Sequence, residues 1–184
     1  MKLKLFIITL IAISFAVTGL LGGCGGKKKN NADEPRDNTI SIQIWDGDNT
    51  ENIYWGTTTG GIEAGAGYDN DDNLIWLAVT REIDNGGLST DTLYVLSGVT
   101  GGNDQRIKCY DYLEDYVNFD ATSSKSNIAK LTHLTYHVWR TTSYNTTGES
   151  TINITTEDGR KTWFTVKVVN SVDDMPEFIP NPPA

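Results

Sequence analysis

The chain has 184 residues, with 24 acidic against 15 basic side chains and a formal net charge of −9. This balance argues against nucleic acid as a partner and against a domain that lies flat on an anionic membrane, because both would repel it. The sequence contains no P-loop, nucleophile elbow or Gly-x-Gly-x-x-Gly run, so the enzyme classes built on those motifs are not expected.

The first 24 residues carry the most specific pattern in the chain. Lys2 and Lys4 precede an apolar run over residues 5–21, and two glycines stand immediately before Cys24. The lysines hold the N-terminus on the cytoplasmic side while the apolar run enters the bilayer. This order resembles the signal peptide and lipobox of bacterial lipoproteins.

The resemblance implies that residues 1–23 are a cleaved signal peptide. Cys24 would then be the new N-terminus, lipidated through a diacylglyceryl thioether and carrying fatty acids such as palmitate. Two or more acyl chains anchor a protein stably in a membrane. Gly25 stands where inner-membrane lipoproteins of Gram-negative bacteria carry Asp, so the resemblance implies the outer membrane if the host is Gram-negative. The expected location is the cell envelope.

Two other interpretations of this segment stay open. The apolar run of 17 residues reaches the lower limit for a membrane-spanning helix, and it could also be an ordinary secretory signal. A cysteine directly after Leu-Gly-Gly favours the lipobox over both. If Cys24 is lipidated, Cys109 has no disulfide partner, and we expect it to be a small buried apolar side chain.

The segment after the cysteine is polar. Residues 24–38 contain no large apolar side chain apart from the cysteine itself, which predicts a disordered tether. The 14 residues after Cys24 would span about 20 Å as a coil and about 46 Å when stretched. The lysines at 27–29 could contact lipid headgroups. Without Lys2 and Lys4, the mature chain has 13 basic and 24 acidic side chains, a net charge of −11.

Residues 39–174 are predicted to form one folded domain. It begins at residues 40–45, where isoleucine occupies every second position, the signature of a half-buried strand. Residues 74–83 and 92–96 are apolar at odd and even positions alike, so we expect central strands covered on both faces. Residues 84–90 are rich in turn formers and are predicted to be the loop between them.

The middle of the domain is less regular. Residues 110–119 fit no period cleanly, and Tyr112, Leu113, Tyr116 and Val117 could form one face of a short helix. Residues 128–139 are predicted to form a single strand with its even positions facing inward. The inward residues would be Leu134, Tyr136 and Val138, and the outward residues His133, Thr135, His137 and Trp139.

Residues 150–156 and 161–169 flank Glu157-Asp158-Gly159-Arg160 and predict a β-hairpin. A two-residue loop would pair Ile152 with Thr165. A three-residue loop, with Gly159 in the left-handed conformation, would pair Ile152 with Phe164. We favour the second register because it places five apolar residues on one face, namely Ile152, Ile154, Phe164, Val166 and Val168.

Short strands, Gly- and Asn-rich turns and few helix formers together predict an all-β fold, a single β-sandwich of immunoglobulin-like type. A partly open β-barrel is the alternative. Residues 175–184 hold four of the five prolines and are predicted to run over the surface as a tail.

Two acidic loops are candidate calcium sites, because hard cations prefer clustered carboxylate and amide oxygens. Their candidate ligands are Asp46, Asp48, Asp69, Asp71 and Asp72. Neither loop matches the EF-hand pattern, and the same residues also favour turns. No other cofactor is expected. His133 and His137 would lie about 13 Å apart along a strand, so we expect surface histidines rather than a zinc site.

The aromatic content suggests a second kind of site. An exposed Trp or Tyr beside Asn and Asp can stack on sugar rings, although most aromatic residues of a sandwich belong to the core. Trp45 and Trp139 lie at positions predicted to face outward, and Trp55 lies beside a Gly-Thr loop.

We therefore expect a non-enzymatic envelope lipoprotein, attached to the membrane through lipid on Cys24. Its β domain would bind another envelope protein or a ligand. One alternative is a carbohydrate- or calcium-dependent binding module. Another is a hydrolase with paired loop carboxylates, which would need two of them about 5–10 Å apart.

Overall fold

The computed structural model describes residues 40–46, 53–83, 87–98, 105–111, 115–135, 138–143 and 145–182. All of them belong to the compact unit Arg36–Ala184. The predicted signal peptide, Cys24 and the tether lie outside the described residues. Among the described residues, no helix is long and apolar enough to cross a membrane.

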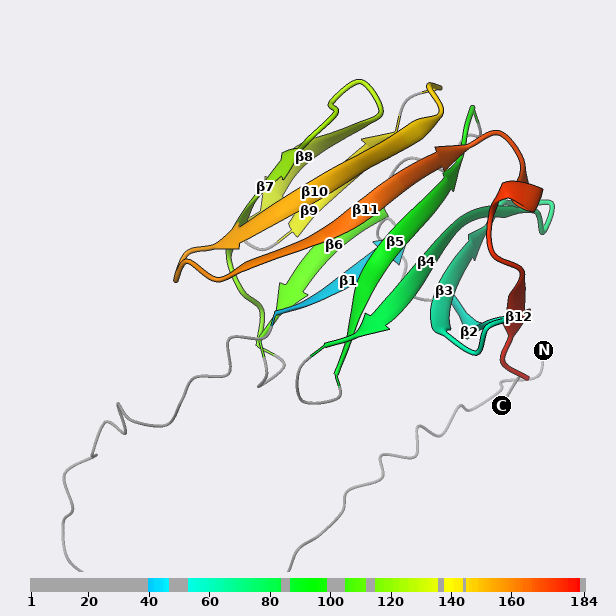
Figure 1. The fold of residues 1–184 in the computed structure, drawn as a ribbon, viewed down its shortest axis with the longest axis horizontal. Coiled ribbons are helices and arrows are strands. Elements are labelled where there is room, and N and C mark those ends of the chain that lie inside the picture. The colour runs from blue at the N-terminus through cyan, green and yellow to red at the C-terminus, as the bar shows by residue number, and fades with distance from the viewer. Residues whose placement is uncertain are drawn as a thin grey trace, which may run out of the picture. The chain divides into compact units, whose positions relative to one another are not determined.

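The described residues form two β-sheets that face each other, as Figure 1 shows. The four-stranded sheet has the order β1-β6-β9-β8, and the eight-stranded sheet has the order β12-β2-β3-β4-β5-β11-β10-β7. The strands are β1 Ser41–Asp46, β2 Tyr54–Thr58, β3 Glu63–Tyr68, β4 Leu74–Glu82, β5 Leu88–Leu96, β6 Gln105–Tyr110, β7 Phe119–Ser123, β8 Ala129–Thr135, β9 Val138–Ser143, β10 Gly148–Thr156, β11 Lys161–Val169 and β12 Phe178–Pro180.

The predicted β-sandwich is confirmed. Every strand pair is antiparallel except β11 with β5. The two sheets meet at β1 and β5, where the Ile42 N–H donates a hydrogen bond of 3.0 Å to the buried Ser89 hydroxyl. Like an immunoglobulin domain, the fold encloses its main core between two sheets, but its larger sheet alone has eight strands.

Strand β4 is covered on both faces, as its sequence predicted. Trp76 and Ala78 point into the main core between the sheets. Leu77 and Val79 point the other way, into a second, smaller apolar cluster on the outer face of the eight-stranded sheet. Residues 74–79 are apolar at every position because each side of this part of the strand has its own core.

Residues 170–177, which we call the strap, cover this second cluster. The strap contains the 3₁₀ helix η3, Val172–Asp174, and its Met175 is buried against Ala64, Ala66 and Leu77. Beyond it, the proline-rich segment adds β12 to the edge of the sheet, antiparallel to β2. The tail therefore carries an edge strand, and its short length and Pro180 limit further strand pairing at that edge.

The prediction of one strand over residues 128–139 is wrong. The segment contains β8 and the start of β9, which pair with each other as a hairpin. The inward parity is also wrong, because the side chain of Leu134 is exposed whereas Ala129 and Leu131 contact the core. Tyr136 and His137 lie outside the described residues.

Two further expectations are corrected. Residues 88–90 were predicted to be part of a loop, but they begin β5, where Ser89 and Thr90 are buried. The described part of residues 110–119 has no helical turn, because Tyr116 forms an isolated antiparallel bridge with Tyr110. Tyr112 and Leu113 lie outside the described residues.

The last hairpin has the predicted register. Ile152 pairs with Phe164, Ser150 pairs with Val166, and Gly159 has a φ of 87°. The Thr156 N–H donates to the Arg160 carbonyl at 3.0 Å and closes the three-residue loop. The five predicted inward residues are all buried. The buried face therefore decided the register.

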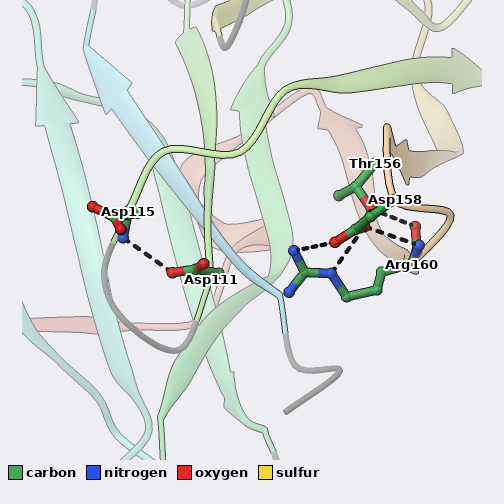
Figure 2. Close-up of polar contacts among 5 residues, drawn as sticks. All are labelled: Asp111, Asp115, Thr156, Asp158 and Arg160. Atoms are coloured by element: carbon green, nitrogen blue, oxygen red, sulfur yellow. Dashed lines mark hydrogen bonds and ion pairs between the residues drawn. The ribbon is translucent and has the colours of Figure 1, made fainter. Parts of the chain in front are cut away.

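The turn of this hairpin is held by Asp158, as Figure 2 shows. Its carboxylate pairs with the Arg160 guanidinium at 2.7 Å and accepts a hydrogen bond from the Thr156 hydroxyl. These contacts, with Arg160 first and Thr156 second, lower the pKa of Asp158.

A lowered pKa in the folded state stabilises the fold above the unfolded pKa of about 3.9 and loses this effect as the pH falls. Because Asp158 is exposed, we expect Asp158→Asn to cost less than about 1 kcal/mol at pH 7. The difference from the wild type should shrink between pH 7 and pH 2 in denaturant unfolding. A difference as large at pH 2 as at pH 7 would contradict the assignment. Asp120→Asn, which changes an exposed carboxylate on β7, is the control.

Candidate functional site

The second acidic loop is a tight turn between β3 and β4. The Asp69 carboxylate accepts the backbone N–H groups of Asp71 and Asn73, both at 2.9 Å, and also the Asn73 side chain. The hydrogen bonds from Asn73 are the main reason that the pKa of Asp69 is lowered. Asp71 and Asp72 are exposed, and Asp72 has a φ of 61°. The Asp69 oxygens thus already serve the turn itself.

Calcium binding at the acidic loops stays a prediction. Asp46 ends β1 opposite Gln105, while its side chain and the whole of Asp48 lie outside the described residues. Within the ranges that the structure describes, no three His, Cys, Asp or Glu side chains gather closely enough to hold a metal ion. The alternative of a hydrolase with paired loop carboxylates likewise stays a prediction.

Trp139 does not face solvent, contrary to the prediction. It packs against the main core, and its indole N–H donates to the Phe119 carbonyl at 3.0 Å. The exposed His133 lies beside it, with 4.9 Å between the ring centroids. Odd positions face inward on both β8 and β9, where Ala129 and Thr141 are buried, whereas the apolar but exposed Leu134 had favoured the even positions.

Cys109 is buried on β6, as predicted. Burial raises the pKa of its thiol far above the ordinary value. A buried, protonated thiol is a poor nucleophile, so its place is in the core.

Several aromatic side chains of the described residues are exposed, which supports the idea of a stacking site. They are Tyr54, Trp55, Tyr116 and Trp163. Trp55 belongs to β2, and its ring lies so close to Gly65 that a Cβ there would come within 3.3 Å of it. The side chain of Trp45 lies outside the described residues.

Trp163 has the most organised surroundings of these four. It lies on β11 with 46% of its surface exposed, and the Arg81 guanidinium carbon is 4.3 Å from the centroid of its indole ring. Arg81 also donates a 2.8 Å hydrogen bond to the Trp163 carbonyl. The guanidinium therefore contacts both the ring and the backbone of the same residue, and it limits how the indole can turn.

Arg81 is itself fixed by a neighbouring strand. Its Nη1 lies 3.0 Å from a carboxylate oxygen of Asp91, and the other oxygen of Asp91 accepts a 3.0 Å hydrogen bond from Thr92. Arg81 uses one terminal nitrogen for Asp91 and the other for the Trp163 carbonyl while its plane lies over the indole. These combined contacts favour Arg over Lys here. The indole is thus preorganised, since its support is held by two further residues.

The surface around this indole is polar. Trp163 is directly opposite Asn153 in the register of β10 and β11, and Thr165 lies opposite Thr151 and, on the other side, Thr92. Alternation places these side chains on the outer face of the eight-stranded sheet, because Phe164 and Val166 between them are buried. We call this surface the Trp163 face, made of Arg81, Asp91, Asn153, Trp163 and Thr165.

Such a surface can bind a sugar ring. The indole provides an apolar plane, and amide, hydroxyl and carboxylate groups beside it can bond to sugar hydroxyls. The exposure of Trp163 could have been predicted from the sequence, because a hairpin register that buries Phe164 turns the adjacent Trp163 outward. The predicted stacking residues were Trp45, Trp55 and Trp139.

No protein-family model, no curated protein and no solved structure matches this chain.

Proposed function

We propose that the protein is a lipid-anchored, non-enzymatic envelope protein that binds a glycan on the Trp163 face. The observation that carries the proposal is the exposed indole of Trp163, held in place by Arg81 and surrounded by Asn and Thr side chains. The orientation of this ring is fixed in advance, so little conformational entropy is lost when a ligand stacks on it. The outer face of a sheet suits an extended saccharide better than a small enclosed substrate.

The glycan proposal is tested with the tryptophan variants. Soluble chito-oligosaccharides, a peptidoglycan fragment, cellohexaose and xylohexaose are titrated into residues 36–184 by calorimetry. Burying one aromatic side chain is worth about 1.5–3 kcal/mol. We therefore expect Trp163→Ala to weaken binding of the accepted glycan at least about tenfold.

Trp55→Ala is the matched control, because Trp55 is also an exposed tryptophan but lies on β2, outside the Trp163 face. It should leave the affinity unchanged. Equal loss in both variants, or no affinity for any glycan of the panel, would contradict the proposal and turn attention to a protein partner.

The lipid anchor is supported by residues 1–24 and has its own test. Changing Cys24 to Ala removes the only thiol available for the thioether. We expect the variant to stay unprocessed or to move to the soluble fraction, whereas wild type is processed and sediments with membranes. A processed Cys24→Ala protein that remains in the membrane would rule out lipid attachment at this residue.

A further inference from the structure

A cavity of about 500 Å³ lies beside the strap, on the outer face of the eight-stranded sheet. It is lined by the strap, by the start of β12 and by the residues that flank the turn between β3 and β4. Figure 1 shows this turn next to the strap. The volume falls within the range of small-molecule sites, about 300–1,000 Å³.

The floor and walls of this cavity are apolar. Met175 of the strap is buried, and the side chains around it, Tyr68, Leu74 and Phe178, are half-buried. All four side chains belong to the second apolar cluster or pack against it. The cavity is therefore a recess in the surface of that cluster, and two of its walls are aromatic rings.

Both rings are held by residues outside the cavity lining. The ring of Tyr54 packs edge-on against Tyr68, with 4.9 Å between the centroids and 79° between the planes. Phe178 lies against the backbone of Gly56, where a Cβ would come within 2.8 Å of the ring. A ligand would therefore meet walls whose orientation is already set, which lowers the entropic cost of binding.

The rim of the cavity is acidic. Asp173 and Glu177 line it and are exposed, and within the described part of the chain neither carboxylate has an ion-pair partner. The Asp173 N–H donates to the Ser171 hydroxyl at 3.2 Å. The Glu177 carbonyl accepts the Thr59 N–H at 3.1 Å. These backbone contacts place two negative charges at the entrance to an apolar recess.

The chain segments around the cavity contain no basic residue. Lys and Arg are absent from the sequence of residues 41–80 and 168–184, which include β2, β3, most of the strap and β12. The cations that flank these segments in the sequence, Arg81 and Lys167, each contact a carboxylate, at 3.0 and 3.3 Å. An anionic ligand would be repelled here, and a neutral ligand would cover the rim carboxylates without compensating their charge. The site therefore favours a cation.

We propose that this cavity binds a small organic ammonium ion with an apolar substituent. The ammonium group would lie between the aromatic walls and the acidic rim, since ring faces and carboxylates both attract cations. The substituent would pack on Leu74 and Met175. A bare metal ion fits less well, because it needs several oxygen ligands and no three acidic, His or Cys side chains of the described residues gather to supply them. The lysine side chain of a partner protein would leave most of the cavity empty.

The test uses residues 36–184, which contain both apolar cores, and Met175 is the reporter. It is the only methionine of this unit, so its labelled methyl group gives one signal besides that of the initiator. The probes hexyltrimethylammonium, hexan-1-ol and hexanoate have chains of similar length and differ in charge. We expect the ammonium to shift the Met175 methyl signal saturably and to bind at least about tenfold tighter than the alcohol. Hexanoate should not bind.

Two variants separate the role of the charge from that of the ring. Asp173→Asn with Glu177→Gln removes the rim carboxylates and should weaken binding of the ammonium about fivefold, the combined effect of two exposed ion pairs. Tyr68→Leu keeps an apolar wall but removes the ring, which should cost the ammonium a similar factor. Both changes should affect hexan-1-ol less. The matched control is Asp120→Asn with Glu157→Gln, which removes two exposed carboxylates beside β7, at the opposite edge of the sheet from β12.

Thermal melting verifies that each variant is folded. The proposal is overturned if no probe shifts the Met175 methyl signal, if the alcohol and the ammonium bind equally, or if the control weakens binding of the ammonium as much as the rim variant does. The result does not depend on the proposed glycan site, because no residue of the Trp163 face lines the cavity. The rim variant should therefore bind glycan like the wild type.

Discussion

Replacing Gly67 by alanine is expected to destabilise the domain by about 3 kcal/mol, the upper end of the range for an overpacked core. Gly67 lies on β3 directly opposite Trp76 of β4. A Cβ at Gly67 would lie 2.0 Å from Nε1 and 2.3 Å from Cε2 of the Trp76 indole. Trp76 is fully buried in the main core, so the ring has no room to move aside.

Denaturant unfolding measures this effect, with Gly60→Ala as the control. A Cβ at Gly60 would meet only the Thr58 hydroxyl, at 3.7 Å, so that variant should change stability by less than about 0.5 kcal/mol. Trp76→Phe removes the atoms that clash, and the double variant should recover part of the loss. Equal stability of Gly67→Ala and Gly60→Ala would mean that the indole does not lie over Gly67.

Phe164→Ala is expected to cost about 4 kcal/mol, the middle of the range for removing a buried aromatic side chain. Phe164 is fully buried in the main core, paired with Ile152 across the last hairpin. Truncation of the neighbouring Trp163 is expected to cost much less stability. Trp163→Ala should cost less than about 1 kcal/mol, because it loses an exposed cation–π contact with Arg81.

This pair of variants tests the register of the hairpin as well as the core. A shift of one residue would bury Trp163 and expose Phe164, since every side chain on the strand would change faces. Urea unfolding of both variants distinguishes the two cases. A larger loss for Trp163→Ala than for Phe164→Ala would show that the strand is inverted and that Trp163 is part of the core.

The elements that could be predicted from sequence are those in which one physical signal dominates. The isoleucines of β1 and the apolar face of the last hairpin alternate cleanly, and a buried face fixes register. Residues 74–79 of β4 are apolar at every position, which correctly indicated cover on both sides. The turn at Gly159 followed from the need for a left-handed residue in a three-residue loop.

The errors arose where no such signal exists. The segment between β8 and β9 contains neither Gly nor Pro, so one strand was predicted where the structure has a hairpin. The inward parity was predicted wrongly because Leu134 is apolar but exposed. The pairing of β12 with β2 depends on a long-range approach at Gly56, where a Cβ would lie 2.2 Å from the Ile179 carbonyl oxygen. Spacing along the chain does not encode such contacts.

The candidate site was only partly accessible to sequence analysis. The outward direction of Trp163 follows from the hairpin register, but its contact with Arg81 joins residues 82 positions apart. The fold assembles this surface from residues that are individually unremarkable.

The most direct test of the proposed function is to map glycan contacts on the described domain by amide chemical shifts. The accepted oligosaccharide of the panel is titrated into isotopically labelled residues 36–184. We predict shifts that centre on Trp163, its indole N–H, Asn153 and Arg81, with the four-stranded sheet unaffected. Shifts confined to another surface, or none at saturating glycan, would contradict a glycan site on the Trp163 face.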